Sequence, residues 1–224
     1  MFINYIQNVI NAGFYVYGAL LPGHFTSPAH LARVRRDAWI DSILDQYDVF
    51  SKQVDKVVII GHSLGAIIAL DLATKRKNYG LIVIAAPIIP KAFLLRVAKP
   101  IIFLLIYTFK YYVFSPKKIQ HYEDLGVEVY HKHPFRTFDE MFKMAKEIEP
   151  NLGKISSPTL LIIGDKDELV SKRTHDLLRG KLKSELIYEW VAPHATHAIV
   201  DTSEIKQFND HLLDFIMNQC MGQN

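Results

Sequence analysis

The chain has 224 residues, of which 50% are hydrophobic and 22% are charged, and its formal net charge at pH 7 is +3. This length suits one well-built core and is short for two domains, and the composition is that of a globular protein. Because the basic residues are spread along the chain, nothing in the sequence indicates nucleic-acid binding. The single cysteine, Cys220, excludes an internal disulfide. We therefore expect a protein of a reducing, cytoplasmic compartment.

The sequence shows neither a secretory signal nor a membrane span. Residues 1–14 lack the basic start and the small-residue cleavage site of a signal peptide. The most apolar region, residues 92–114, contains Arg96, Lys99, Pro100 and Lys110. Its uncharged stretches are much shorter than the ~20 residues that cross a bilayer, so we do not expect a transmembrane helix there.

Short runs of β-branched residues alternate with longer helical patterns, which predicts an α/β fold: a mostly parallel sheet with helices on both faces. We expect strands over residues 14–20, 56–61 and 81–87, and a strand followed by a loop in 158–167 and in 184–197. We expect helices over residues 2–10, 30–53 and 66–77, near 171–180, and from Thr202 or Ser203 onward.

Residues 90–150 interrupt this alternation, since they are mainly helical in pattern and rich in aromatic residues. We interpret them as a helical cap inserted into a hydrolase-like core that consists of residues 1–89 and 151–224.

One short segment carries a chemical signal: Gly61-His62-Ser63-Leu64-Gly65 follows a buried strand and precedes an apolar helix. It fits the G-x-S-x-G pattern, in which a sharp strand-to-helix turn exposes a serine hydroxyl. Glycine on both sides leaves room for the strained backbone of such a turn. The N-terminus of the next helix directs free amides to the place where an oxyanion would form. The pattern indicates that Ser63 is a nucleophile.

A serine nucleophile needs a base, and the base needs an acid that orients it. Candidates for the acid are Asp165 and Asp167, in the loop after "TLLIIG", and candidates for the base are His194 and His197, in the loop after the last predicted strand. Loops at the carboxyl ends of parallel strands lie at one edge of a sheet, where Ser63 also lies. The chain order serine, aspartate, histidine is that of the α/β-hydrolase triad.

In these motifs the chain resembles the α/β-hydrolase-fold serine esterases, and it is most similar to small bacterial carboxylesterases and monoacylglycerol lipases. The resemblance is carried, in order, by "LLPGHFTSP", "GHSLG", "LLIIGDKDELV" and "HATHAIVDTSE". It covers almost the whole chain except the insertion. Its G-x-x-D pattern selects Asp167 as the acid, and the position just before the final helix selects His197 as the base.

The resemblance implies hydrolysis of a carboxylic ester through an acyl-enzyme, with the Leu64 amide in the oxyanion hole and with no metal or other cofactor. His62, beside the nucleophile, is expected to form a wall of the substrate pocket. Phe25 follows His24 where relatives read G-H-G, and it is expected to reshape that pocket. Relatives also begin with a strand and a His-Gly loop that supplies a second oxyanion amide. Because this sequence starts inside the next helix, we expect an N-terminally short core.

The insertion bears on the substrate and partners. Its aromatic and aliphatic residues suit an acyl chain, and Lys110, Lys117 and Lys118 suit a peripheral contact with a membrane. We expect a short-chain or monoacylglycerol-like ester as the partner, and no nucleic acid. Two alternatives remain open. One is an impaired, shortened hydrolase-fold protein that binds a lipid or a protein, and the other is the same chemistry on a thioester, amide or C–C bond.

Overall fold

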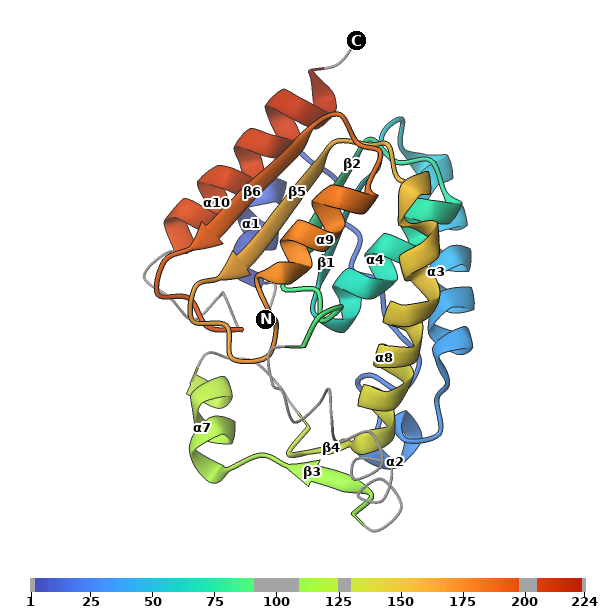
Figure 1. Ribbon diagram of the computed structural model, residues 1–224, viewed down its shortest axis with the longest axis vertical. Helices are drawn as coiled ribbons and strands as arrows, with labels where there is room; N and C mark the ends of the chain where they lie inside the picture. The colour runs from blue at the N-terminus through green and yellow to red at the C-terminus, as the bar shows by residue number, and fades with distance from the viewer. Residues whose placement is uncertain (1–2, 91–108, 125–129, 198–204, 223–224) are drawn as a thin grey trace.

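The computed structural model describes residues 3–90, 109–124, 130–197 and 205–222, and within them four strands form the central sheet (Figure 1). These strands are β1 (Val58–His62), β2 (Gly80–Ile84), β5 (Thr159–Gly164) and β6 (Ile187–Ala192). They lie in the order β1-β2-β5-β6, and all neighbouring pairs are parallel. The predicted parallel sheet is therefore confirmed.

Helices cover both faces of the sheet (Figure 1). One face carries α3 (Arg36–Phe50), α4 (Leu64–Lys75), α8 (Phe135–Ile148) and α9 (Arg173–Lys181). The other carries α1 (Ile3–Asn11), α10 (Ile205–Asp214) and the π-helical η4 (Phe215–Met221). In β2, Leu81 and Val83 pack toward α4, whereas Ile82 and Ile84 pack toward α10. Both faces are buried, which explains why the strand is apolar at every position.

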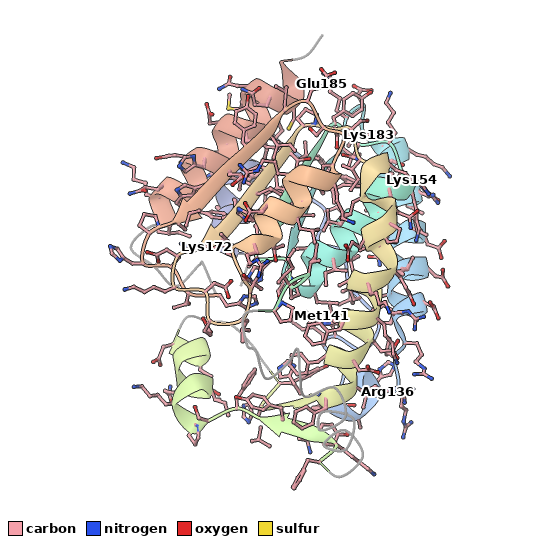
Figure 2. All side chains as sticks on the ribbon, viewed as in Figure 1. Arg136, Met141, Lys154, Lys172, Lys183 and Glu185 are labelled. Atoms are coloured by element: carbon pink, nitrogen blue, oxygen red, sulfur yellow. The ribbon has the colours of Figure 1, made fainter. Side chains whose placement is uncertain are left out.

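The remaining elements are short. They are α2 (Pro28–Leu31), η1 (Ser51–Gln53), β3 (Tyr111–Val113), α7 (Pro116–Asp124), β4 (Lys132–Pro134) and η2 (Glu149–Lys154). The β3 and β4 strands pair antiparallel in a ribbon that the helical pattern of this region did not predict. The ribbon lies at the end of the molecule opposite to Lys183 and Glu185 (Figure 2). Among the described helices, none is long and apolar enough to cross a membrane.

Residues 14–20, predicted as the first strand, are irregular in the structure, so that prediction is wrong. The alternation of buried and exposed side chains that led to this prediction is nevertheless present: Phe14 packs against the core, whereas Tyr15 is 81% exposed. At the end of the segment, however, the Leu20 amide donates to Gln46 Oε1 at 3.1 Å, and the Leu20 carbonyl accepts from Gln46 Nε2 at 3.0 Å. A side chain of α3 thus takes the place of a partner strand there.

The predicted cap, residues 90–150, ends in α8, which packs against α3 and α4. The buried Glu140 carboxylate on α8 accepts from Arg35 Nη1 at 3.0 Å, and from both the amide and Nη1 of Arg36 at 3.2 Å. Since a buried carboxylate is costly without such donors, these bonds hold α8 at the start of α3. The boundary between core and cap stays a prediction.

The turn after β1 is so tight that Gly61 must lack a side chain. A Cβ on Gly61 would lie 2.2 Å from the Gly65 carbonyl oxygen and 2.7 Å from Cβ of Ala69. A Cβ on Gly65 would meet nothing within 4 Å. The motif suggested that both glycines serve the turn, but backbone packing requires only Gly61.

We expect Gly61→Ala to lower the free energy of unfolding by more than about 2 kcal/mol, because the strand or the turn must move to admit the methyl group. The matched control is Gly65→Ala, which should be neutral or stabilise by about 0.5–1 kcal/mol because alanine suits a helix better than glycine. Urea unfolding followed by circular dichroism measures both. Equal stabilities for the two variants would contradict this account of the turn.

Candidate active site

Ser63 occupies the turn between β1 and α4, with φ 54° and ψ −119°. Residues with a side chain rarely adopt such a positive φ, and backbone strain of this kind is concentrated at functional sites. The Ser63 amide donates to the carbonyl of Ile84 at the end of β2, at 2.9 Å. Leu64 is the first residue of α4, where backbone amides have no acceptor within the helix. The serine hydroxyl and a donor amide are therefore neighbours at the N-terminus of α4.

Asp167, in the loop after β5, is buried, and both oxygens of its carboxylate have hydrogen-bond partners. Its Oδ1 accepts from the amides of Leu169 and Val170, both at 2.8 Å, and its Oδ2 lies 3.0 Å from His197 Nδ1. Burial raises the pKa of this carboxyl, but the hydrogen bond and charge of His197, together with the two amides, outweigh burial. The pKa of Asp167 is consequently held below its ordinary value, and the group is ionised at neutral pH.

His197 lies between this carboxylate and the serine. Its Nδ1 faces Asp167, and its Nε2 lies 2.9 Å from Ser63 Oγ. Because a carboxylate only accepts, Nδ1 carries the proton and Nε2 is left to accept from the hydroxyl. A general base needs this tautomer. The structure thus brings together three residues from separate parts of the chain, in an arrangement that can activate the Ser63 hydroxyl.

The two alternative candidates lie outside this arrangement. His194 is exposed and has φ 58°. Asp165 donates its amide to the Ala192 carbonyl at 3.0 Å. In the part of the chain that the structure describes, no hydrogen bond joins either side chain to Ser63 or His197.

The loops of Asp167 and His197 lie against each other because Gly164, at the end of β5, has no side chain. A Cβ on Gly164 would lie 2.1 Å from the Ala195 carbonyl oxygen. That oxygen also accepts from the Lys166 amide at 3.0 Å. No motif in the sequence assigned a role to Gly164. The signal that could have found it is a glycine that ends a buried strand directly before the acid loop.

His62, predicted as a pocket wall, packs against the candidate base. The two imidazole rings have centroids 5.2 Å apart, and His62 Nε2 lies 2.9 Å from the His197 carbonyl oxygen. Since a carbonyl only accepts, His62 Nε2 carries a proton and donates it. Burial, followed by the charge of His197, lowers the pKa of His62 to about 4, against the opposing effects of this hydrogen bond and of Asp167. The His62 ring is therefore neutral at pH 7.

Phe25, the other predicted substrate-binding residue, is 78% exposed. Its loop is tied to the predicted cap by Tyr130, whose hydroxyl donates to the Gly23 carbonyl at 3.0 Å and accepts from the Thr26 amide at 2.6 Å. A role of Phe25 in binding stays a prediction.

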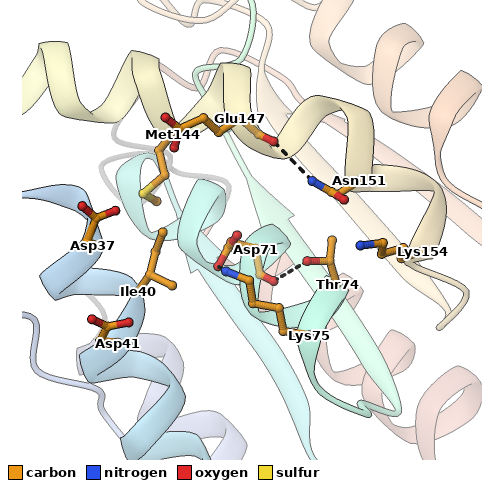
Figure 3. A pocket seen from close by; sticks show the side chains of 10 residues that line it. All are labelled: Asp37, Ile40, Asp41, Asp71, Thr74, Lys75, Met144, Glu147, Asn151 and Lys154. Carbon is orange, nitrogen blue, oxygen red and sulfur yellow. Dashed lines mark hydrogen bonds and ion pairs between the residues drawn. The ribbon is translucent and has the colours of Figure 1, made fainter.

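A hollow of about 420 Å³ lies elsewhere, between α3, α4 and α8 (Figure 3). Its charged lining consists of Asp37, Asp41, Asp71, Lys75, Glu147 and Lys154. Lys75 Nζ bonds to Asp71 Oδ2 at 2.6 Å, so charges of both signs meet inside it. None of the three converging residues lines this hollow, which therefore forms no part of the candidate active site.

Similarity to known proteins identifies the family of the chain. A family model described as "Serine aminopeptidase, S33" matches residues 2–204. The chain belongs to this family of hydrolases. A carboxylesterase of Bacillus subtilis (strain 168) is 19% identical to this hydrolase over 176 residues, which are 77% of this chain and 69% of the esterase.

Solved structures of lipolytic enzymes share the fold of this hydrolase. A structure of the metagenome-derived lipolytic enzymes LipS and LipT matches with a TM-score of 0.80 at 17% identity, over 96% of this chain and 86% of that chain. The monoacylglycerol lipase of Paleococcus ferrophilus matches with a TM-score of 0.73 at 19% identity, over 97% and 89% of the two chains. The predicted α/β-hydrolase fold, and the resemblance to esterases and lipases, are therefore confirmed.

We expect the His62 imidazole to stay neutral from pH 8 down to about 5, because its pKa of about 4 lies well below the ordinary 6.5. Histidine-ring NMR spectra measure this, with the resonance assigned by its loss in His62→Gln. A titration midpoint near 6.5 would contradict the burial described above. In the unfolded chain His62 binds a proton near pH 6.5, whereas in the folded chain it does so only near pH 4. The free energy of unfolding therefore falls as the pH is lowered from 6.5 to 4, because protonation of His62 favours the unfolded chain.

Proposed function

We propose that this hydrolase cleaves carboxylic esters by forming an acyl-enzyme on Ser63. The Ser63 hydroxyl oxygen attacks the ester carbonyl carbon while its proton passes to His197 Nε2. The oxyanion of the tetrahedral intermediate accepts a hydrogen bond from the Leu64 amide at the N-terminus of α4. The C–O bond to the alcohol then breaks, and His197 returns the proton to the departing oxygen.

A water molecule completes the cycle. His197 takes a proton from the water as its oxygen attacks the acyl carbon, and then gives the proton to Ser63 Oγ as the acid is released. Asp167 stays ionised throughout, in keeping with its lowered pKa. Its role is to hold the imidazole in the required tautomer and to stabilise the imidazolium that forms in each half of the reaction.

The observation that carries the proposal is the pair of hydrogen bonds on the His197 ring, 2.9 Å to Ser63 and 3.0 Å to Asp167. A general base acts only within such reach of the proton it removes. The side chains of His197 and Asp167 are 13% and 1% exposed. Since little water reaches this pair, the attraction between carboxylate and imidazolium is screened less than on the surface.

The proposed substrates are short-chain or monoacylglycerol-like esters. The support is that similar proteins are named carboxylesterase and monoacylglycerol lipase. The family description, serine aminopeptidase, suggests an amide as the alternative bond that the enzyme would cleave. The same acyl-enzyme steps serve both, so a p-nitrophenyl butyrate assay beside an aminoacyl p-nitroanilide assay separates the two classes of substrate.

We expect Ser63→Ala to abolish ester turnover and labelling by a fluorophosphonate probe. His197→Gln and Asp167→Asn should each lower kcat about 10³-fold or more. The first removes the group that accepts the proton from Ser63, and the second removes the carboxylate that holds His197 in the required tautomer. Steady-state kinetics with p-nitrophenyl butyrate measure these effects.

The chain offers a matched control for each of the latter variants. His194→Gln and Asp165→Asn change the same residue types in the same loops, and both should stay within about threefold of the wild-type rate. Wild-type turnover by Ser63→Ala, or an equal loss in a control and its partner variant, would refute the proposed roles.

A further inference from the structure

The main chain of His197 is held on both sides. Its amide donates to Glu168 Oε2 at 3.1 Å, and its carbonyl accepts from His62 Nε2 at 2.9 Å. Its two ring nitrogens bond to Asp167 and Ser63. All four polar groups of the residue therefore have partners, and the main-chain partners are not explained by the two-step reaction itself.

The bond from His62 directly links two parts of the sheet that the strand ladder connects only through the two strands between them. The strands β2 and β5 lie between β1 and β6. Ladder hydrogen bonds therefore tie the strand that leads to His197 to its neighbour β5, but not to β1. His62 is the last residue of β1 and directly precedes Ser63. Its bond to His197 thus adds a link between the segment that carries the serine and the segment that carries the imidazole.

The two main-chain bonds also differ in their surroundings. The hydrogen bond from His62 is partly buried, whereas the hydrogen bond to Glu168 is exposed. A hydrogen bond that is shielded from water, even in part, costs more to lose than an exposed one, because water replaces the exposed partner. The His62 bond should therefore contribute more to holding His197 than the Glu168 bond does.

We propose that His62 and Glu168 are positioning residues that fix the main chain of His197, so that its Nε2 stays within reach of Ser63 Oγ. The inference rests on the proposed function, in which His197 is the general base. Its reason is geometric, since a displacement of about 1 Å in a reacting group can cost about 10²-fold in rate. The donors and acceptors are complementary, because a neutral imidazole N–H donates to a carbonyl and a carboxylate accepts from an amide.

The first test compares His62→Phe with His62→Gln. Phenylalanine keeps a planar ring and removes the donor, whereas glutamine offers an amide N–H near the place of Nε2. We expect His62→Phe to lower kcat about 10- to 100-fold with KM within about twofold, and His62→Gln to recover most of the loss. Wild-type kcat in His62→Phe would overturn the role of His62. So would a folded His62→Gln protein that is as slow as His62→Phe.

The second test uses Glu168→Ala, a change at an exposed position that should not impair folding. We expect kcat to fall about 3- to 10-fold, again with little change in KM. The matched control is Glu185→Ala. Glu185 is exposed and precedes β6, whereas His197 follows β6, and Figure 2 shows Glu185 at the end of the molecule opposite to the β3–β4 ribbon. Equal rates for the two variants would overturn the role of Glu168.

A third readout separates this inference from the proposed function. Hydrogen exchange followed by mass spectrometry reports the amides of residues 193–197 without any turnover. We expect faster exchange there in His62→Phe and Glu168→Ala than in the wild type and Glu185→Ala. If Ser63→Ala keeps its turnover, the proposed function fails whatever the exchange result. Unchanged exchange overturns the positioning role even in a protein whose Ser63 labels normally.

Discussion

The candidate active site depends on parallel strands that end at one edge of the sheet. One row of residues is level across all four strands: His62, Ile84, Ile162 and Trp190. Ser63 follows the first strand of this row at once, whereas Asp167 and His197 come after loops that leave the last two strands at the same edge. An antiparallel strand would carry its loop to the opposite edge of the sheet. That edge is several residues away along the strand, and each residue adds ~3.3 Å. The parallel register therefore decides which side chains meet.

This arrangement has a cost that the core offsets. The positive φ of Ser63 and a buried carboxylate at Asp167 each cost a few kcal/mol in isolation. The turn persists because α4 is buried along most of its length between the sheet and the neighbouring helices, and because Gly61 lets that helix come close. The carboxylate persists because two amides and an imidazole surround it. Packing on both faces of the sheet thus maintains a local conformation that short peptides would not keep.

The sequence predicted the buried strands and the positions of Ser63, Asp167 and His197 after them, because these depend on local runs of apolar residues and turn residues. It failed at residues 14–20, since whether an alternating segment pairs depends on distant neighbours. The bond of His62 to His197 spans 135 positions in the chain and is accepted by a main-chain carbonyl. Every residue has such a carbonyl, so the sequence could not predict this bond from the type of residue. The expected start of the final helix, at Thr202 or Ser203, lies outside the described residues.

The most direct test of the central claim is a crystal structure of the protein after reaction with a fluorophosphonate. We predict a covalent bond from phosphorus to Ser63 Oγ, with the phosphonyl oxygen about 3 Å from the Leu64 amide. The imidazole of His197 should remain bonded to Asp167 through Nδ1. An adduct on another residue, or a His197 ring turned away from both Ser63 and Asp167, would contradict the claim that these side chains form one catalytic unit.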